Sequence, residues 1–230
     1  MGQHILQGNP PVEVILKRSA RARRISLRIS SLDGRVTLTL PRGVSDREGL
    51  AFAREKESWL RGHLDTRSTP VEVGIGARIP LAGQMLTLRP GTGRGIRAEG
   101  DSLLVPGDPD SAGRRVLAYL RTLARDRLAG ACDHYAERLG HPYAKLTLRD
   151  TRSRWGSCTA EGGLMFSWRL ILAPPEILDY VAAHEVAHLA EMNHSAAFWK
   201  VVHRIHGPHD KARGWLRTNG PELHRYRFGD

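Results

Sequence analysis

The chain has 230 residues, of which 40% are hydrophobic and 26% are charged, and its formal net charge is +11. This length fits one large domain or two small ones, and the apolar fraction is sufficient for a buried core. No apolar run approaches the roughly 20 residues needed to cross a bilayer, and the first residues lack the pattern of a secretory signal. Because Cys132 and Cys158 are the only cysteines, no disulfide framework is expected, and composition predicts a cytoplasmic protein without a membrane partner.

The positive charge is densest between residues 17 and 28, a segment that contains no acidic residue. Its basic residues are Lys17, Arg18, Arg21, Arg23, Arg24 and Arg28. One interpretation is the solvated face of a strand in an Arg-rich chain. The other is a surface that binds nucleic acid or another polyanion. The sequence leaves both interpretations open.

Residues 1–109 are expected to form a β-rich N-terminal region with one helix. Apolar and polar residues alternate over 25–29 and again over 36–40, and Asp33-Gly34 between them is typical of a tight turn, so this segment predicts a hairpin. Ser45 is a suitable N-cap for a helix over about 45–64. The Gly- and Pro-rich stretch that follows, up to residue 109, is expected to contain further short strands.

Residues 110–230 are expected to form the second region. An apolar stripe at helical spacing predicts a helix over about 111–139, which Gly140 ends. A short strand near 146–148 and a strand-like run over 164–172 follow. Pro174-Pro175-Glu176 then suits the first turn of another helix, because proline and an acidic residue are both favoured there.

This last helix carries the central motif, His184-Glu185-Val186-Ala187-His188. Histidines four residues apart on a helix project from the same face one turn apart, so their ring nitrogens can share one zinc ion. Glu185 is placed to reach a water molecule bound to that metal and to accept its proton. The alternative is a helix whose histidines lie at its surface or in its core.

A third ligand is needed for a catalytic zinc site, and two residues are candidates. Met192-Asn193 can close the helix, and a chain that turns there brings His194 back over the metal. Glu191 shares the helix face of His184 and His188, but a straight helix carries it beyond the metal. We therefore favour His194 as the third ligand and Glu191 as a residue that supports the site from behind. Three ligands leave the fourth position for water.

Another group of histidines, His203, His206 and His209, follows within a few residues. No cysteine or acidic ligand set accompanies them, so they are interpreted as surface or substrate-side residues. The aromatic residues around the motif are interpreted mainly as packing residues: Trp155, Trp168, Phe198 and Trp199.

Four blocks of this sequence resemble the YgjP-like metallopeptidases, which are related to the SprT-like and WLM zinc peptidases. The blocks are Arg154 to Cys158, Trp168 to Pro174, Tyr180 to Leu189 and Asn193 to Trp199. The resemblance is strong over about 145–220, and the order of the N-terminal strand, hairpin and helix is also similar. Glu191 stands where metzincins have glycine, and no methionine follows Met192, so the chain departs from the metzincin pattern.

The resemblance implies an α+β fold with a zincin-like catalytic core, in which helices pack on a small, mostly antiparallel sheet. It also implies Zn2+ as the cofactor, with His184, His188 and His194 as ligands and Glu185 as the catalytic base. A protein or peptide substrate is expected to bind along an edge strand ahead of the active helix, for which 164–170 is the candidate. Arg152, Arg154 and Tyr180 are available to stabilise the oxyanion.

The expected activity is hydrolysis of peptide bonds by water that zinc activates and Glu185 deprotonates. The alternative is a nucleic-acid-associated protein in which zinc is mainly structural, or a protease that acts on DNA-bound proteins through the basic segment 17–28. A hydrolase and a protein with a structural zinc differ in their need for Glu185, because a structural site has no use for a carboxylate beside an open metal position.

Overall fold

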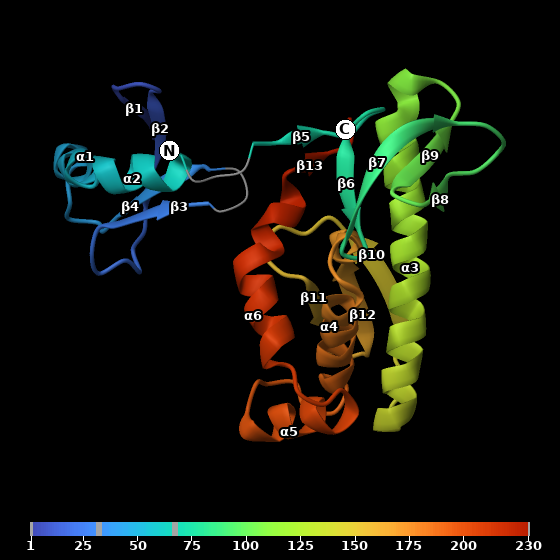
Figure 1. The fold of residues 1–230 in the computed structure, drawn as a ribbon. Coiled ribbons are helices and arrows are strands. Elements are labelled where there is room, and N and C mark those ends of the chain that lie inside the picture. Colours follow the sequence, from blue (N-terminus) through green and yellow to red (C-terminus); the bar gives the residue numbers. More distant parts are fainter. Residues whose placement is uncertain (1, 31–33, 66–68, 230) are drawn as a thin grey trace. The chain divides into compact units, whose positions relative to one another are not determined.

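The structure is a computed structural model, and it describes residues 2–30, 34–65 and 69–229 (Figure 1). The chain divides into two compact units, residues 1–69 and 70–230. Each unit has its own cluster of buried apolar side chains. The fold combines small sheets with helices, so the α+β prediction is confirmed.

The first unit is a four-stranded sheet with order β1-β2-β4-β3, accompanied by two helices. Its elements are β1 (Gly2–Leu6), β2 (Val12–Arg18), β3 (Ser26–Ile29), β4 (Val36–Leu40), α1 (Asp46–Glu55) and α2 (Glu57–Asp65). The alternating sequence of β2 and β4 places Val14, Leu16 and Leu38 in the core, because successive side chains in a strand point to opposite faces.

The expected hairpin and helix of the first unit are confirmed. Strands β3 and β4 pair antiparallel, and Gly34 adopts φ 71° near the turn, while Asp33 lies outside the described residues. Ser45 caps α1 through a complete capping box with Glu48. The expected helix over 45–64 is interrupted at Lys56, so two helices occupy this range.

The second unit begins with a four-stranded sheet of order β6-β7-β9-β8. Its strands are β6 (Arg78–Leu81), β7 (Gln84–Gly91), β8 (Arg97–Glu99) and β9 (Ser102–Pro106). A further pair, β5 (Val71–Glu72) and β13 (Tyr226–Arg227), joins the start of this unit to its end in parallel. A short 3-10 turn, η1 (Pro109–Ser111), leads into α3 (Ala112–Leu139), which confirms the helix expected over 111–139.

Helix α3 runs along the whole second unit and contributes to its core over most of its length (Figure 1). Its buried residues include Val116, Leu120, Ala124 and Leu128, which recur at helical spacing. Gly140 ends the helix with φ 80°, a left-handed conformation that glycine adopts without steric cost. The helix packs against both α4 and the segment that precedes it.

A three-stranded sheet of order β10-β12-β11 follows α3. The strands are β10 (Lys145–Arg149), β11 (Gly156–Cys158) and β12 (Gly163–Ser167). Strand β12 pairs in parallel with β10 and antiparallel with β11. The strand expected over 164–172 is therefore half right, because the chain after Ser167 forms the 3-10 helix η2 (Trp168–Leu172), whose side chains are all buried.

The C-terminal helices are α4 (Pro175–Ala187), α5 (Ala196–Ile205) and α6 (Asp210–Asn219), followed by the 3-10 helix η3 (Gly220–His224). Pro175 and Glu176 occupy the first turn of α4, as expected. The helix ends at Ala187 with His188 as its C-cap, earlier than the predicted closure at Met192-Asn193. Residues 188–190 continue as a turn, so the chain reverses sooner than the sequence indicates.

The division at 69/70 differs from the boundary at 109/110 that composition suggested. Residues 70–109 pack Val73, Ile79, Leu88 and Leu103 into the same core as α3 and α4. This core requires the sheet of β6 to β9 as one of its walls, which is a long-range relationship that local composition does not report. No helix within the described ranges is both long enough and apolar enough to cross a membrane.

Candidate metal centre

The end of α4 and the loop behind it bring together three imidazoles. One ring nitrogen from each of His184, His188 and His194 lies within 4.8 Å of the other two. The Nε2 atoms of His184 and His194 are 3.0 Å apart and face each other. Two neutral imidazoles at this distance can share one hydrogen bond, in which one ring donates and the other accepts. The same two nitrogens also suit bonds to one cation, because a tetrahedral zinc with ligands at about 2.0–2.1 Å requires nitrogen separations of roughly 3.3 Å.

His188 is oriented by the main chain of the loop that follows it. Its Nδ1 lies 2.9 Å from the carbonyl oxygen of Glu191, which favours the tautomer that leaves Nε2 free for a metal. Glu191 thus supports the site through its backbone. Among the described residues, the group of candidate ligands contains the three histidines and not the Glu191 carboxylate.

Phe198 of α5 forms the floor beneath the three rings. It is fully buried, and its ring lies 4.4 Å from that of His188, 4.9 Å from His184 and 4.8 Å from His194 between centroids. Ser195, the N-cap of α5, and Asn193 hold the loop that carries His194, since Asn193 Oδ1 accepts a hydrogen bond from the Ser195 amide. The expected packing role of Phe198 therefore applies directly at the histidine cluster.

Burial keeps two of the imidazoles neutral. It lowers the pKa of His184 to about 3, an effect that the neighbouring cationic groups reinforce, and it also lowers the pKa of His188. Neutral imidazole is the form that binds a metal. The Nδ1 atom of His184 is buried and has no hydrogen-bond partner among the described residues. The donor set and its protonation thus fit a divalent cation such as zinc.

Glu185 lies beside this cluster and is 5% exposed. Burial raises the pKa of its carboxyl to about 8, and the positive charge of Arg154 opposes the increase. The backbone of β11 covers the side chain closely, because a Cβ atom at Gly156 would lie 2.5 Å from Glu185 Cγ and 2.6 Å from Oε1. In the sequence, Gly156 belongs to the block Arg154 to Cys158, and no local pattern predicts this contact with Glu185.

Of the three candidate oxyanion donors, two lie next to the site. The Tyr180 ring packs edge-on to His184 with 5.9 Å between centroids. The positive charge of Arg154 lowers the pKa of Glu185. Arg152 instead lies near His224. Burial lowers the pKa of His224 to about 4, and the positive charges of Arg169 and Arg152 add to this effect. His206 and His209 pack around Tyr180, whereas His203 is exposed, and no group of potential metal ligands in the described ranges includes these three histidines.

The expected substrate strand over 164–170 is wrong as an edge. Strand β12 has a hydrogen-bonded neighbour on each side, so it has no free edge for a peptide. Strand β11 is the outer strand on this side of the sheet, and it contacts α4. The physical reason is that β10, which precedes β11 in the chain, occupies the opposite edge in parallel with β12.

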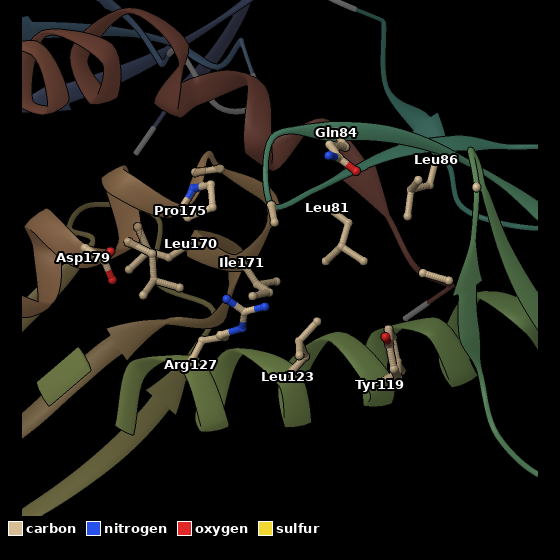
Figure 2. A pocket seen from close by; sticks show the side chains of 15 residues that line it. Leu81, Gln84, Leu86, Tyr119, Leu123, Arg127, Leu170, Ile171, Pro175 and Asp179 are labelled. Atoms are coloured by element: carbon tan, nitrogen blue, oxygen red, sulfur yellow. The ribbon is translucent and has the colours of Figure 1, made fainter. Parts of the chain in front are cut away.

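A cavity of about 330 Å³ lies beside the first turns of α4, at the end of this helix away from His188 (Figure 2). Its walls are mostly apolar and come from β6, β7, α3 and η2, with Leu81, Leu123 and Ile171 among them. Arg127 and Asp179 are its charged residues. None of the three clustered histidines lines it, so the cavity is separate from the candidate metal centre.

Residues 23–219 match the family model described as the YgjP-like metallopeptidase domain. Since the match covers most of the chain, this protein belongs to the YgjP-like family and carries a metallopeptidase domain. Among solved structures, the chain is similar to the metallopeptidase zymogen abylysin of Pyrococcus abyssi, with 18% sequence identity and a TM-score of 0.36 over 40% of this chain and 95% of that one. No curated protein matched the sequence.

Proposed function

We propose that this protein is a zinc-dependent peptidase in which His184, His188 and His194 hold the metal and Glu185 is the catalytic base. The observation that carries the proposal is the convergence of three ring nitrogens within 4.8 Å beside a buried carboxyl group. A structural site needs only the ligands. The buried glutamate next to them is what a hydrolase requires.

The metal, when bound, supplies Lewis acidity and lowers the pKa of a coordinated water molecule. The chain supplies the proton acceptor, because Glu185 follows His184 directly and is held under the β11 backbone at Gly156. In its carboxylate form, Glu185 can take a proton from water and return it to the leaving amine. Arg154, whose positive charge lowers the pKa of Glu185, is the candidate donor to the developing oxyanion in this proposal, and Tyr180, which packs against His184, is the alternative.

The substrate in this proposal is an extended peptide that adds to β11. An edge strand offers unpaired backbone groups, which fix the direction and register of a peptide without reading its side chains. Because Gly156 of β11 lies against Glu185, a peptide along this edge passes close to the base and the three histidines.

A second function, binding of nucleic acid, is supported by the surface of the first unit. All six basic side chains between residues 17 and 28 are exposed. Only Arg18 among them pairs with an acid in the described residues, namely Asp46. Residues 1–69 contain 13 Lys and Arg against 7 Asp and Glu, so this unit carries a large share of the positive charge. Such a surface attracts phosphate backbones without reading sequence.

The experiment that tests the peptidase is metal analysis of tag-free protein alongside peptide cleavage, for wild type, His194→Ala and Glu185→Ala. We expect about one zinc per chain in wild type and in Glu185→Ala, and a clear loss in His194→Ala, because three ligands are needed for tight binding. Glu185→Ala should lose hydrolysis. Unchanged cleavage by this variant, or a folded wild type that takes up no zinc on reconstitution, would contradict the proposal.

A further inference from the structure

A cluster of aromatic rings lies next to the three histidines. It is formed by Tyr180 of α4, Trp199 of α5 and His209 at the start of α6, together with His184 itself. The His209 ring lies nearly parallel to those of Tyr180 and Trp199, at 5.9 and 5.1 Å between centroids. Both partners also contact His184, at 5.9 Å for Tyr180 and 5.8 Å for Trp199. The four rings therefore form one contiguous aromatic cluster that extends from the candidate metal centre to the start of α6, with Tyr180 buried and the other three half-buried.

Arg213 of α6 lies over the Trp199 ring of this cluster. Its guanidinium carbon lies 5.0 Å from the centre of the Trp199 ring, so a single indole separates its charge from His184. The side chain is exposed, and within the described part of the chain it makes no hydrogen bond or ion pair. A guanidinium held over an indole keeps its donors free for a planar anion such as a carboxylate.

Arg154 provides a second cation at the same site. It comes from the loop between β10 and β11, and its positive charge lowers the pKa of Glu185. Its side chain is exposed and likewise makes no hydrogen bond or ion pair with the described residues. The two arginines thus approach the site from different elements. Arg154 lies near Glu185, and Arg213 lies on the far side of the Trp199 ring.

Neither Asp210 nor Glu191 pairs with Arg154 or Arg213 among the described residues. Asp210 lies near Tyr180, but no ion pair joins it to Arg213 in the described structure. Glu191 turns its backbone carbonyl toward His188. The positive charge of Arg213 contributes to the lowered pKa of His184, after burial and the neighbouring histidines. The two exposed arginines, Arg154 and Arg213, therefore favour anionic partners at this site.

We propose that Arg213 is a specificity residue that selects peptides with an acidic side chain within two residues of the scissile bond. This inference rests on the proposed peptidase function and adds the substrate class. An extended peptide advances by about 3.3 Å per residue. A side chain one or two residues from a bond held at the histidines therefore spans the width of the Trp199 ring and reaches the guanidinium.

The test uses a set of fluorescent peptides with one common core and Glu, Gln or Lys at each of the two positions on either side of the expected bond. Binding is measured by anisotropy to zinc-loaded Glu185→Gln protein, so that no turnover is required. Cleavage is measured with the wild type. The variants are Arg213→Gln, Arg213→Glu and the control Arg217→Glu, which reverses an exposed charge one turn further along α6.

The Glu peptide should bind roughly three- to tenfold more tightly than the Gln peptide, the range expected for one partly exposed ion pair, and salt should reduce the difference. Arg213→Gln should abolish the preference and Arg213→Glu should reverse it toward Lys. The readout is the ratio of the affinities for the Glu and Gln peptides within each variant, because a general change in binding affects both peptides alike. Arg217→Glu should keep the preference for Glu.

Binding of all peptides with equal affinity, or a preference that persists in Arg213→Glu, would overturn this inference and leave the peptidase proposal intact. A zinc-loaded protein that binds and cleaves none of the peptides would overturn both. A preference lost equally in Arg217→Glu would assign it to the general charge of α6 and would also overturn the role given to Arg213.

Discussion

Gly156 and Glu185 are in direct contact, with the backbone of strand β11 resting on the carboxylate side chain of helix α4. Any side chain at position 156 would overlap Glu185 Oε1, because an added Cβ would lie only 2.6 Å from it. The glycine is therefore required by close approach. It couples the position of the proposed base to the strand along which a peptide is proposed to bind.

This contact makes Gly156→Ala a test of how accurately Glu185 must be placed. We expect the variant to bind zinc like the wild type and to lose at least about 100-fold in kcat, since displacement by about 1 Å can have that effect. Gly130→Ala in α3 is the matched control, because a Cβ there meets nothing within 4 Å. The control should keep full activity. Full activity of Gly156→Ala would show that the base tolerates the displacement.

Glu191 supports His188 through a backbone carbonyl, so its carboxylate should be dispensable for the metal. We expect Glu191→Ala to bind zinc within about threefold of wild type, whereas His194→Ala should lose more than the 10- to 100-fold typical of an outer-shell partner. Competition with a chromogenic chelator measures both affinities. Comparable losses in the two variants would make Glu191 a ligand.

The buried carboxyl of Glu185 predicts how the stability of the metal-free protein depends on pH. Its pKa is about 8 in the folded chain and 4.5 ordinarily. Between these values the folded state holds a proton that the unfolded state has lost, so stability falls as pH rises from 4.5 to 8. Glu185→Gln lacks this loss. Its stability relative to wild type should rise by on the order of 2–4 kcal/mol between pH 5 and pH 9.

Urea unfolding of metal-free protein at several pH values measures this difference. Glu176→Gln, an exposed change in the first turn of the same helix, serves as the control and should follow wild type at every pH. A constant difference between Glu185→Gln and wild type would show that Glu185 is ionised in the folded metal-free protein.

Arg169 joins three parts of the second unit. Its Nε and Nη2 donate to the two carboxylate oxygens of Asp150 at 2.7 and 3.0 Å, and its Nη1 donates to the carbonyl oxygens of Leu223 and Tyr226. Burial raises the pKa of Asp150, but the hydrogen bonds and charge of Arg169 outweigh this and lower it. Removing Arg169 leaves the buried carbonyl oxygens of Leu223 and Tyr226 without this donor, whereas the Asp150 side chain, which is 32% exposed, can still reach water.

We therefore expect Arg169→Met to destabilise the protein by about 2–4 kcal/mol, because two buried carbonyl oxygens lose their donor. The matched control is Arg227→Met, because the pair of Arg227 with Glu72 is exposed and 3.7 Å long. Its loss should change stability by less than about 1 kcal/mol. Chemical denaturation of both variants checks the difference, and equal effects would mean that burial adds nothing to the Arg169 network.

The basic surface of the first unit predicts salt-dependent binding to nucleic acid. Reversal of Arg21, Arg23 and Arg24 to Glu should weaken binding to a DNA duplex at least about 100-fold at low salt, and it should reduce the slope of log K against log salt. Reversal of Arg114, Arg121 and Arg125 on α3 is a control with the same change in net charge. If both triple variants bind alike, residues 17–28 are only a solvated strand face.

Local patterns were sufficient for the elements that build the site. The apolar stripe of α3, the Pro-Pro-Glu start of α4 and the spacing of His184 and His188 each depend on residues a few positions apart. Such patterns report helical geometry directly, because the backbone repeats every 3.6 residues. The same reasoning favoured His194 over Glu191, although it placed the helix end four or five residues too late.

The tertiary structure decided which strand has a free edge and which charges face the histidines. Whether β11 or β12 is the outer strand depends on β10, which pairs in parallel from the opposite side, and nothing within β12 itself records that pairing. Arg213 reaches the site only because α6 folds back over Trp199. These relationships join residues far apart in the chain, so they follow from packing the whole second unit and not from local periodicity.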